Sequence, residues 1–252
     1  MMPLRSAAQG HQFCPWTREG PFFVGEEEAV RKQTYRATRG YENLQHLQFW
    51  GVGRYEIPQI APEYEVPDTT WIGFNYVRGC EDPEEHGVHF FLDDYQFQRV
   101  WAEPNRYTDR LAQFRAVLSP DFSPYANFPP AIQIYNHYRK HWLAAMWQTR
   151  GMTVIPTVTW SDSRSFDFCF TGEPICSVVA LSSVSTQKTD EYKKWFLDGY
   201  EEMMRRLNPS HILWRGTVPP ECESDRKIIT ELPVFTARFD AEKEAKDGQD
   251  QS

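Results

Sequence analysis

Four aspartates follow short apolar segments of this chain, at positions where carboxylates can do chemistry. They are Asp93 and Asp94 after residues 88–92, Asp121 after residues 116–118, and Asp162 after residues 153–159. If these segments are neighbouring strands of a parallel sheet, their carboxyl ends share one edge and bring the four side chains together. Converging carboxylates bind Mg²⁺ or Mn²⁺, and such an ion activates water for phosphoester hydrolysis. We therefore expect Asp93, Asp121 and Asp162 to be metal ligands and Asp121 and Asp162 to be catalytic.

Aspartate at a strand end also has a purely structural use. Its side chain accepts hydrogen bonds from the free N–H groups of the following helix, or forms a turn. Asp94 precedes a predicted helix, and Asp121 and Asp162 lie in Ser-Pro-Asp and Trp-Ser-Asp sequences that suit turns. Capping therefore competes with metal binding at each position, and Asp94 is expected to be a helix cap.

Large or basic side chains also occupy predicted strand ends, namely Arg78, Trp160, Trp214 and Arg215. The aromatic rings could form the floor of a pocket, and the arginines could face an anionic substrate. We expect these four residues to bind the ligand. Large aromatics at the mouth of a barrel also simply close the core, so both interpretations stay open.

A helix predicted over residues 131–150 carries His137 and His141 on one face. The pair could hold a metal, but Tyr138 follows the first histidine, so the Glu of a zinc-protease motif is absent. Basic and aromatic residues also mix on this helix: Tyr135, Tyr138, Arg139, Lys140, His141, Trp142, Trp147 and Arg150. Such a mixture could stack nucleobases or bind phosphate. We favour the simpler interpretation, in which the aromatics pack on the core and the bases face solvent.

Sequence motifs of several enzyme classes are missing. The serines after predicted strands lack the Gly-x-Ser-x-Gly elbow of serine hydrolases, and the chain has no Gly-rich phosphate loop. The five cysteines form no Cys-x-x-Cys pair, which favours reduced thiols over a disulfide framework. Cys169 lies in an aromatic run and is expected to be a buried thiol.

The elements that must position these residues alternate regularly from Trp71 onward. Strands are predicted over residues 71–78, 88–92, 116–118, 153–159, 177–182 and 211–214. Helices are predicted over residues 97–114, where Pro104 breaks the helix in two, and over 131–150 and 189–207. This alternation requires parallel strands joined by right-handed crossovers. The sequence therefore predicts an α/β fold with a mostly parallel sheet of βα repeats, as a partial or irregular TIM-like barrel. An open doubly wound sheet is the alternative.

The length and composition allow one large domain. The chain has 252 residues, of which 40% are hydrophobic, enough to form a sizeable core. We expect an irregular N-terminal arm over residues 1–45, a single α/β domain over residues 46–238 and a disordered acidic tail over residues 239–252. A complete barrel takes about 250 residues, more than this domain has.

The net charge of −8 argues against a broad electrostatic nucleic-acid binder, whose affinity comes from Lys and Arg at phosphates. No window approaches 18 consecutive apolar residues, and the N-terminus lacks the apolar core of a secretion signal. We therefore expect a cytoplasmic protein outside the membrane.

Four sequence blocks occur together in a pattern typical of one family. They are Phe91-Leu-Asp-Asp-Tyr95 with Trp101, Leu118-Ser-Pro-Asp-Phe-Ser123, Val154-Ile-Pro-Thr-Val-Thr-Trp-Ser161 and Ser165-Phe-Asp-Phe-Cys-Phe-Thr-Gly172. In this combination the chain resembles, over roughly residues 70 to 216, a domain family of unknown function found in bacteria, phages and mobile elements. The resemblance implies a cellular or phage-encoded soluble protein and carries over no catalytic residue.

Two functions stay open from the sequence. The first is a metal-assisted hydrolase that acts on a nucleic acid or nucleotide, with Mg²⁺ or Mn²⁺ held by Asp93, Asp121 and Asp162. The second is a non-catalytic binding protein whose aromatic rim recognises a host protein or a single-stranded nucleic acid. The acidic composition favours a protein partner. The distances between the three carboxylates distinguish the two functions.

Overall fold

Parallel strands that follow the order of the sequence form the framework of the protein. The computed structural model describes residues 49–232, so the predicted arm and tail lie outside the described residues. Four strands form one parallel sheet: β3 (Thr70–Gly73), β4 (His86–His89), β5 (Ala116–Leu118) and β6 (Val154–Ile155). Three form a second: β7 (Val178–Ser182), β8 (His211–Arg215) and β9 (Ile229–Glu231). A short antiparallel pair, β1 (Gly51–Val52) and β2 (Ile57–Pro58), precedes them.

The two parallel sheets meet just after β6. Thr157 and Ala180 form a parallel bridge. The N–H of Val158 donates to the carbonyl of Ala180, and the N–H of Ala180 donates to the carbonyl of Pro156, both at 2.8 Å. The ladder is thin here because Pro156 has no N–H to donate. The strand order nevertheless continues from β3 to β9 without reversal.

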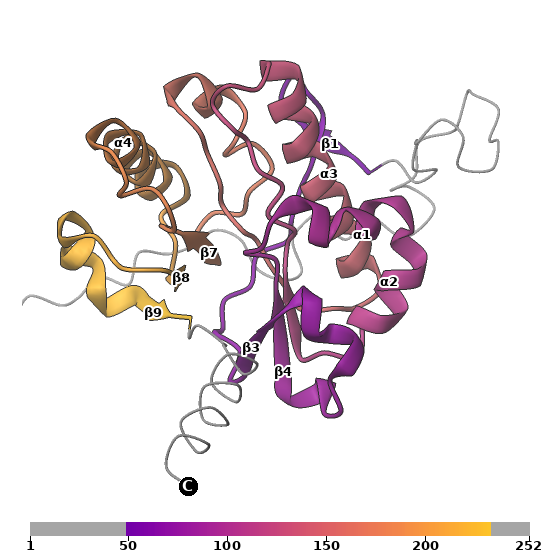
Figure 1. Cartoon of the computed structure of the whole chain (residues 1–252). Helices are drawn as coiled ribbons and strands as arrows, with labels where there is room; N and C mark the ends of the chain where they lie inside the picture. The colour runs from indigo at the N-terminus through magenta and orange to yellow at the C-terminus, as the bar shows by residue number, and fades with distance from the viewer. Residues whose placement is uncertain (1–48, 233–252) are drawn as a thin grey trace, which may run out of the picture.

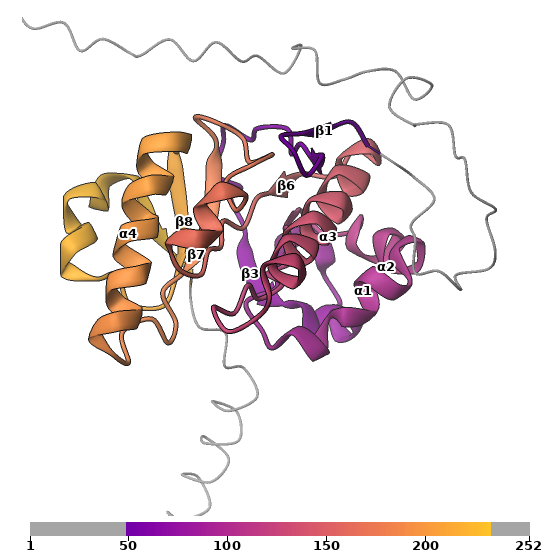
Figure 2. The same cartoon turned by 90° about the horizontal axis from the view of Figure 1, so that it is seen from above.

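The helices cover one face of this strand array. The α-helices are α1 (Gln98–Ala102), α2 (Pro104–Leu111), α3 (Pro130–Thr149) and α4 (Asp190–Leu207). The 3-10 helices are η1 (Phe74–Gly79), η2 (Pro83–Glu85), η3 (Asp94–Gln96), η4 (Ser163–Asp167) and η5 (Pro220–Ile228). Alternate strand residues such as Val88 and Val117 pack in one cluster with α1, α2 and α3, and Val179 and Ile212 pack in another with α4. Figures 1 and 2 show α1–α3 beside the first sheet and α4 beside the second.

The opposite face of the strands has its own apolar cluster. It contains Trp71, Ala116, Leu118, Ile155, Val178, Ala180, Leu213 and Leu232. Because side chains of β3 and β8 share this cluster, the strands curl around it. Helices on one face and a sequential strand order exclude the doubly wound alternative, whose strand order reverses. The predicted α/β class with a parallel sheet is confirmed, but β3 and β9 are not paired in the described range, so no closed barrel is present there.

Most predicted elements are confirmed, but the strands predicted over residues 71–78, 88–92 and 153–159 end earlier than predicted, at Gly73, His89 and Ile155. The helix predicted over residues 97–114 is split before Pro104, and the other two helices agree with α3 and α4. β3 ends at Gly73 because the chain turns into η1, whose Phe74 and Val77 are buried in the helix-side cluster. β6 ends before Pro156. No helix of the described residues is long and apolar enough to cross a membrane.

Gly87 on β4 gives a test of the inner cluster. A Cβ at Gly87 would lie 2.6 Å from the indole of Trp71, so Gly87→Ala must displace this buried ring. We expect a loss of about 1 to 3 kcal/mol in the free energy of unfolding, measured by urea denaturation. Gly79→Ala is the control, because a Cβ there meets nothing within 4 Å, and it should change stability by less than about 0.5 kcal/mol. Equal effects of the two substitutions would contradict the described packing.

Candidate binding cleft at the carboxyl edge of the sheet

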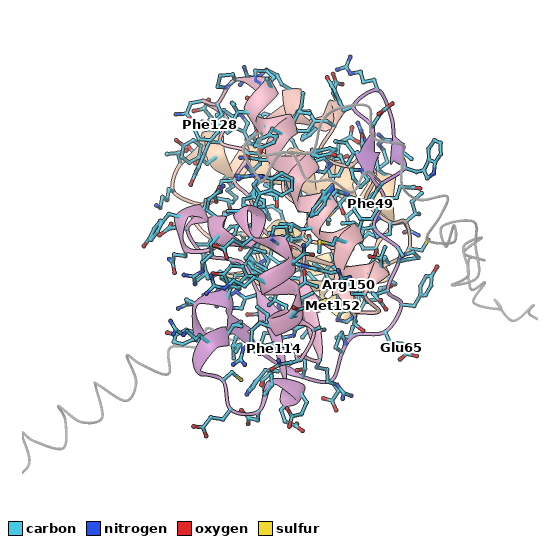
Figure 3. All side chains as sticks on the ribbon, turned by 90° about the vertical axis from the view of Figure 1, so that its right-hand side faces the viewer. Phe49, Glu65, Phe114, Phe128, Arg150 and Met152 are labelled. Atoms are coloured by element: carbon cyan, nitrogen blue, oxygen red, sulfur yellow. The ribbon has the colours of Figure 1, made fainter. Side chains whose placement is uncertain are left out.

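A cleft of about 800 Å³ opens at the carboxyl edge of the sheet. We call it the rim cleft. Its walls are residues 121 and 123–127 after β5, residues 158–162 and 164 after β6, residues 182 and 184–186 at the end of β7, and residues 191, 192, 195 and 196 on α4. These segments meet because parallel strands bring their carboxyl ends to one edge. In Figure 3, Phe114, before β5, and Phe128, after it, lie toward opposite ends of the molecule.

Aromatic rings form much of the cleft wall: Tyr125, Trp160, Tyr192, Trp195 and Phe196. The indole N–H of Trp160 donates to the backbone carbonyl of Trp195 at 3.2 Å. α4 can approach this indole because Gly199 has no side chain, and a Cβ there would lie 2.1 Å from Trp160 Nε1. Tyr125 and Tyr192 are 53% and 45% exposed. The cleft therefore presents accessible aromatic surface on a wall that packing holds in place.

Carboxylates outnumber basic groups in the cleft. Asp121, Asp162 and Glu191 line it together with a single guanidinium, that of Arg164. The guanidinium donates to both oxygens of Asp162, from Nε at 3.0 Å and from Nη2 at 2.6 Å. This ion pair neutralises Asp162. Among the lining residues, Asp121 and Glu191 thus leave the cleft with net negative charge.

Asp121 lies half-buried in the cleft wall, where it accepts a hydrogen bond from Thr159 Oγ1 at 2.5 Å. Burial raises the pKa of Asp121 to about 6, and the Thr159 hydroxyl and the Lys140 ammonium offset this only in part. Its ionised form therefore costs stability near neutral pH. A neutral amide at this position would be more stable than the carboxylate. Carboxyls with a pKa raised in this way are concentrated at functional sites, where a protein gives up stability for activity or binding.

The three aspartates predicted to share a metal ion do not converge. Asp93 is exposed and does not line the cleft, whereas Asp121 and Asp162 do. Among the described residues, two groups of three His, Cys, Asp or Glu side chains bring their ligand atoms within 4.8 Å, and neither contains any of these aspartates. Asp162 instead caps η4 by accepting from the N–H of Arg164 at 3.0 Å. Asp162 therefore has the structural role of a helix cap rather than that of a metal ligand.

Asp94 has a structural role different from the predicted helix cap. Its carboxylate accepts from the backbone N–H of Ser123 at 3.2 Å and from the Ser123 hydroxyl at 2.8 Å. The side chain makes no cap hydrogen bond at η3 or α1. Asp94 therefore joins the loop after β4 to the loop after β5, which holds one wall of the cleft in place.

The other residues predicted to bind ligand are separated by the fold. Trp160 lines the cleft. Trp214 is fully buried and donates its indole N–H to Ser183 Oγ at 2.9 Å, so it belongs to the core. Arg78 is exposed on η1, and Arg215 lies at the end of β8, where burial lowers its pKa; neither lines the cleft.

The sequence predicted that the basic residues of α3 face solvent, and this prediction is wrong. They are buried because the helix is covered on several sides. Lys140 and His141 are 2% and 0% exposed, and Arg139 stacks on Phe122 with 3.6 Å between Cζ and the ring centre. His137 is buried as well and its Nε2 donates to the carbonyl of Thr171 at 2.9 Å. These four residues therefore cannot form a patch for nucleic acid.

Glu173 explains how α3 buries its basic residues. Its Oε1 accepts from Lys140 Nζ at 2.6 Å and from His141 Nε2 at 3.0 Å. Lys140 Nζ also donates to the carbonyl of Thr157 at 2.7 Å, and His141 Nδ1 lies 2.7 Å from the carbonyl oxygen of Pro58. Burial alone would raise the pKa of Glu173, but the charge of Lys140 and the contact with His141 lower it.

The same cluster has the ligand spacing of a metal site, formed by His137, His141 and Glu173. However, the Lys140 ammonium already pairs with Glu173 Oε1, the oxygen that faces His141, and its positive charge repels a cation there. The cluster is therefore best described as a buried ion-pair network. Glu173 lies 33 residues from Lys140, and no local sequence pattern pairs them.

Cys169 is buried, and burial raises the pKa of its thiol to about 12. A thiol that stays protonated is a poor nucleophile, which agrees with the predicted buried thiol. Cys80 and Cys222 are free thiols as well.

Residues 49–233 match the family described as "Domain of unknown function (DUF4417)". The chain belongs to this family. It is similar to the Gene 1 protein of Mycobacterium phage L5, with 37% identity over 194 residues that cover 76% of this chain and 84% of that protein. It is also similar to the Gene 1 protein of Mycobacterium phage D29, with 35% identity over 186 residues that cover 73% of this chain and 68% of that protein. No solved structure matches the chain. The predicted resemblance to a family of unknown function that occurs in phages is confirmed.

Asp121→Asn tests the electrostatic cost of the cleft. The folded-state pKa of Asp121, about 6, exceeds its ordinary value, so the folded protein binds the proton more tightly than the unfolded chain. The loss of folding stability caused by ionised Asp121 is complete above pH 6 and disappears as the pH falls toward 4. We expect Asp121→Asn to stabilise the protein at pH 7 by on the order of 1 to 3 kcal/mol, and to have little effect near pH 4. Urea denaturation at both pH values measures this difference.

Asp162→Asn is the matched control, because the same substitution there has the opposite sign. The hydrogen bonds and charge of Arg164 lower the pKa of Asp162, so its ionised form stabilises the fold. Asp162→Asn should destabilise the protein at pH 7 by up to about 1 kcal/mol. A stabilising effect at both positions would contradict the described electrostatics.

Glu173→Gln tests the buried network. The substitution leaves the Lys140 ammonium buried without its carboxylate, and we expect a loss of about 3 to 5 kcal/mol in the free energy of unfolding. Glu202→Gln serves as the control, because Glu202 pairs with Arg205 and Arg206 at the surface and should cost less than about 1 kcal/mol. Chemical denaturation of both variants checks the difference, and similar small losses would refute the role given to the network.

Proposed function

We propose that this protein is a non-catalytic binding protein whose rim cleft takes a lysine or arginine side chain of a protein partner. The observation that carries the proposal is Asp121, a carboxylate placed in an aromatic-lined cleft at a cost in stability. A cationic ligand would offset that cost directly, because it favours the ionised carboxylate.

The lining of the cleft supports a cationic ligand. Tyr125, Trp160 and Tyr192 offer ring faces, which attract Lys and Arg side chains through the negative charge of the aromatic π-system. Asp121 and Glu191 offer carboxylates that accept charge-assisted hydrogen bonds. Since Arg164 is engaged with Asp162, the lining has little to attract a phosphate.

The charge distribution also favours a protein over a nucleic acid. The basic residues of α3 are buried rather than arranged on the surface, and the chain carries a net charge of −8. Nucleic-acid binding draws most of its affinity from Lys and Arg at phosphates. The volume of the cleft, about 800 Å³, is in the range of sites that enclose a large side chain and its neighbours.

A metal-assisted hydrolase is the less favoured function. It needs carboxylates that converge on a cation, and Asp93, Asp121 and Asp162 do not form such a group among the described residues. A thermal-shift titration with Mg²⁺ and Mn²⁺ probes this function independently. A saturable rise in melting temperature that Asp121→Asn abolishes would favour the hydrolase over the binding protein.

Short peptides test the proposed recognition. The probes are Gly-Arg-Gly and Gly-Lys-Gly with blocked termini, with Gly-Gln-Gly as the uncharged reference. We expect weak saturable binding of the two cationic peptides, followed by NMR shifts of the indole N–H groups of Trp160 and Trp195. Asp121→Asn should weaken this binding about 10-fold, because a hydrogen bond to a charged group contributes about 1.5 to 3 kcal/mol.

Asp198→Asn is the control for the loss of one negative charge. Asp198 lies on α4 outside the cleft lining and pairs with Lys194, so its substitution should leave peptide binding unchanged. The proposal fails if Gly-Gln-Gly binds as tightly as the cationic peptides, or if the Asp121 and Asp198 variants lose the same affinity.

A further inference from the structure

Three metal-binding side chains meet at the amino edge of the sheet, away from the rim cleft. They lie between η1 and β4 in the sequence Cys80-Glu-Asp82-Pro-Glu-Glu-His86. Their ligand atoms lie within 4.8 Å of one another. Since the strands are parallel, this edge carries the strand starts, and any role here is independent of the proposed function of the cleft.

The distances within the group are close to those of a metal site. Asp82 Oδ1 lies 3.8 Å from Cys80 Sγ and 3.4 Å from His86 Nε2. Tetrahedral zinc binds sulfur, nitrogen and oxygen at about 2.0 to 2.3 Å, which puts the ligand atoms about 3.3 to 3.6 Å apart. A shift of a few tenths of an ångström would therefore suit Asp82 Oδ1 to share an ion with either of the other two atoms, and Cys80 Sγ and His86 Nε2 lie within 4.8 Å of each other.

The imidazole of His86 already has the orientation of a metal ligand. Its Nδ1 lies 2.6 Å from Thr70 Oγ1, on the neighbouring strand β3, and its Nε2 is turned to Asp82. Metal-binding histidines usually donate their second ring N–H to an oxygen, which fixes the tautomer and points the other nitrogen at the metal. Thr70 supplies that oxygen here.

The charges suit a divalent cation. A thiolate and a carboxylate together offset two positive charges, while the imidazole is neutral. A neighbouring hollow of about 410 Å³ is lined by Glu63, Glu65 and Glu84 with only Arg115 as a basic group, so its net negative charge attracts cations to this edge. The side chains of Asp82 and His86 are 62% and 21% exposed, which lets an ion and a water molecule enter.

We infer that Cys80, Asp82 and His86 bind one zinc ion, with a water molecule as the fourth ligand. Zinc suits this set because it accepts sulfur, nitrogen and oxygen ligands together. The ion would tie the loop after η1 to the start of β4 and, through Thr70, to the start of β3. Partial burial raises the pKa of the Cys80 thiol, so binding releases a proton from it.

The second such group of the described residues, His137, His141 and Glu173, does not compete as a zinc site. Glu173 Oε1, the oxygen that faces His141, already pairs with the Lys140 ammonium at 2.6 Å, and this positive charge opposes a cation. At the amino edge, by contrast, the carboxylate of Asp82 contacts Cys80 Sγ and His86 Nε2.

Metal titration of the purified full-length chain tests the site. Zn²⁺ is titrated by calorimetry, and Co²⁺ is titrated by visible and near-ultraviolet absorption. We expect one equivalent of each metal, with Co²⁺ giving the intense visible bands of tetrahedral coordination and a thiolate charge-transfer band. Cys80→Ser should abolish the charge-transfer band, and His86→Gln should weaken binding at least 10-fold, the effect of losing one zinc ligand.

Matched controls exist for both substitutions. Cys176 and His211 are likewise partly exposed and lie outside the group, so Cys176→Ser and His211→Gln should keep full binding of both metals. Circular dichroism of each variant checks that it folds. The inference is wrong if the parent protein binds neither metal stoichiometrically, or if the charge-transfer band persists in Cys80→Ser, which would assign it to another cysteine.

Discussion

Lys140 and Glu173 form a buried ion pair at the place where the strands β3–β6 give way to β7–β9. Burying two charges costs several kcal/mol each, and the cost is offset only when hydrogen bonds surround both ions. Here the carbonyl of Thr157 accepts from Lys140 and His141 contacts Glu173 Oε1, whereas Glu173 Oε2 is buried without a hydrogen-bond partner among the described residues, so the cost is offset in part. The backbone crosses the same junction through a single bridge and its hydrogen bonds. The side chains therefore provide much of the connection between the two sheets.

The rim cleft depends on this junction. The carbonyl of Thr157 accepts from Lys140. Thr157 also donates two hydrogen bonds of 2.8 Å to Ser119, from its N–H to the Ser119 hydroxyl and from its hydroxyl to the Ser119 carbonyl. Asp121 and Thr159 follow two residues after Ser119 and Thr157, and their own hydrogen bond continues the same pairing. The position of Asp121 thus follows from the network that holds the sheets together. The ammonium of Lys140 also lowers the pKa that burial raises at Asp121.

The sequence predicted the elements well because their signals are local. Apolar runs that end in polar residues mark the strands, 3.6-residue spacing marks α3 and α4, and Pro104 marks the break between α1 and α2. The edge that carries the cleft was predicted for the same reason, because the carboxyl ends of parallel strands meet. Asp121, Trp160 and Asp162 all reached it.

The residues that the sequence misplaced depend on contacts between distant segments. Lys140 resembles a solvent-facing base until Glu173, 33 residues later, is brought against it. Trp160 and Trp214 both end apolar runs, yet Trp214 is covered by α4 side chains such as Phe196 and Tyr200, whereas Trp160 borders the cleft. Asp93 and Asp121 stand at neighbouring strand ends, but only Asp121 turns into the cleft. No spacing along the chain distinguishes such pairs.

The central claim is that burial destabilises the ionised form of Asp121 and that a cationic group of a partner binds this carboxylate. Carboxyl ¹³C NMR titration of Asp121 in the protein, with Asp121→Asn for assignment, measures its pKa directly. The account predicts a pKa of about 6 in the free protein, and a clear fall when the arginine peptide is added at saturating concentration. A pKa near 3.8, the ordinary value for aspartate, would contradict it, as would a raised pKa that the peptide leaves unchanged.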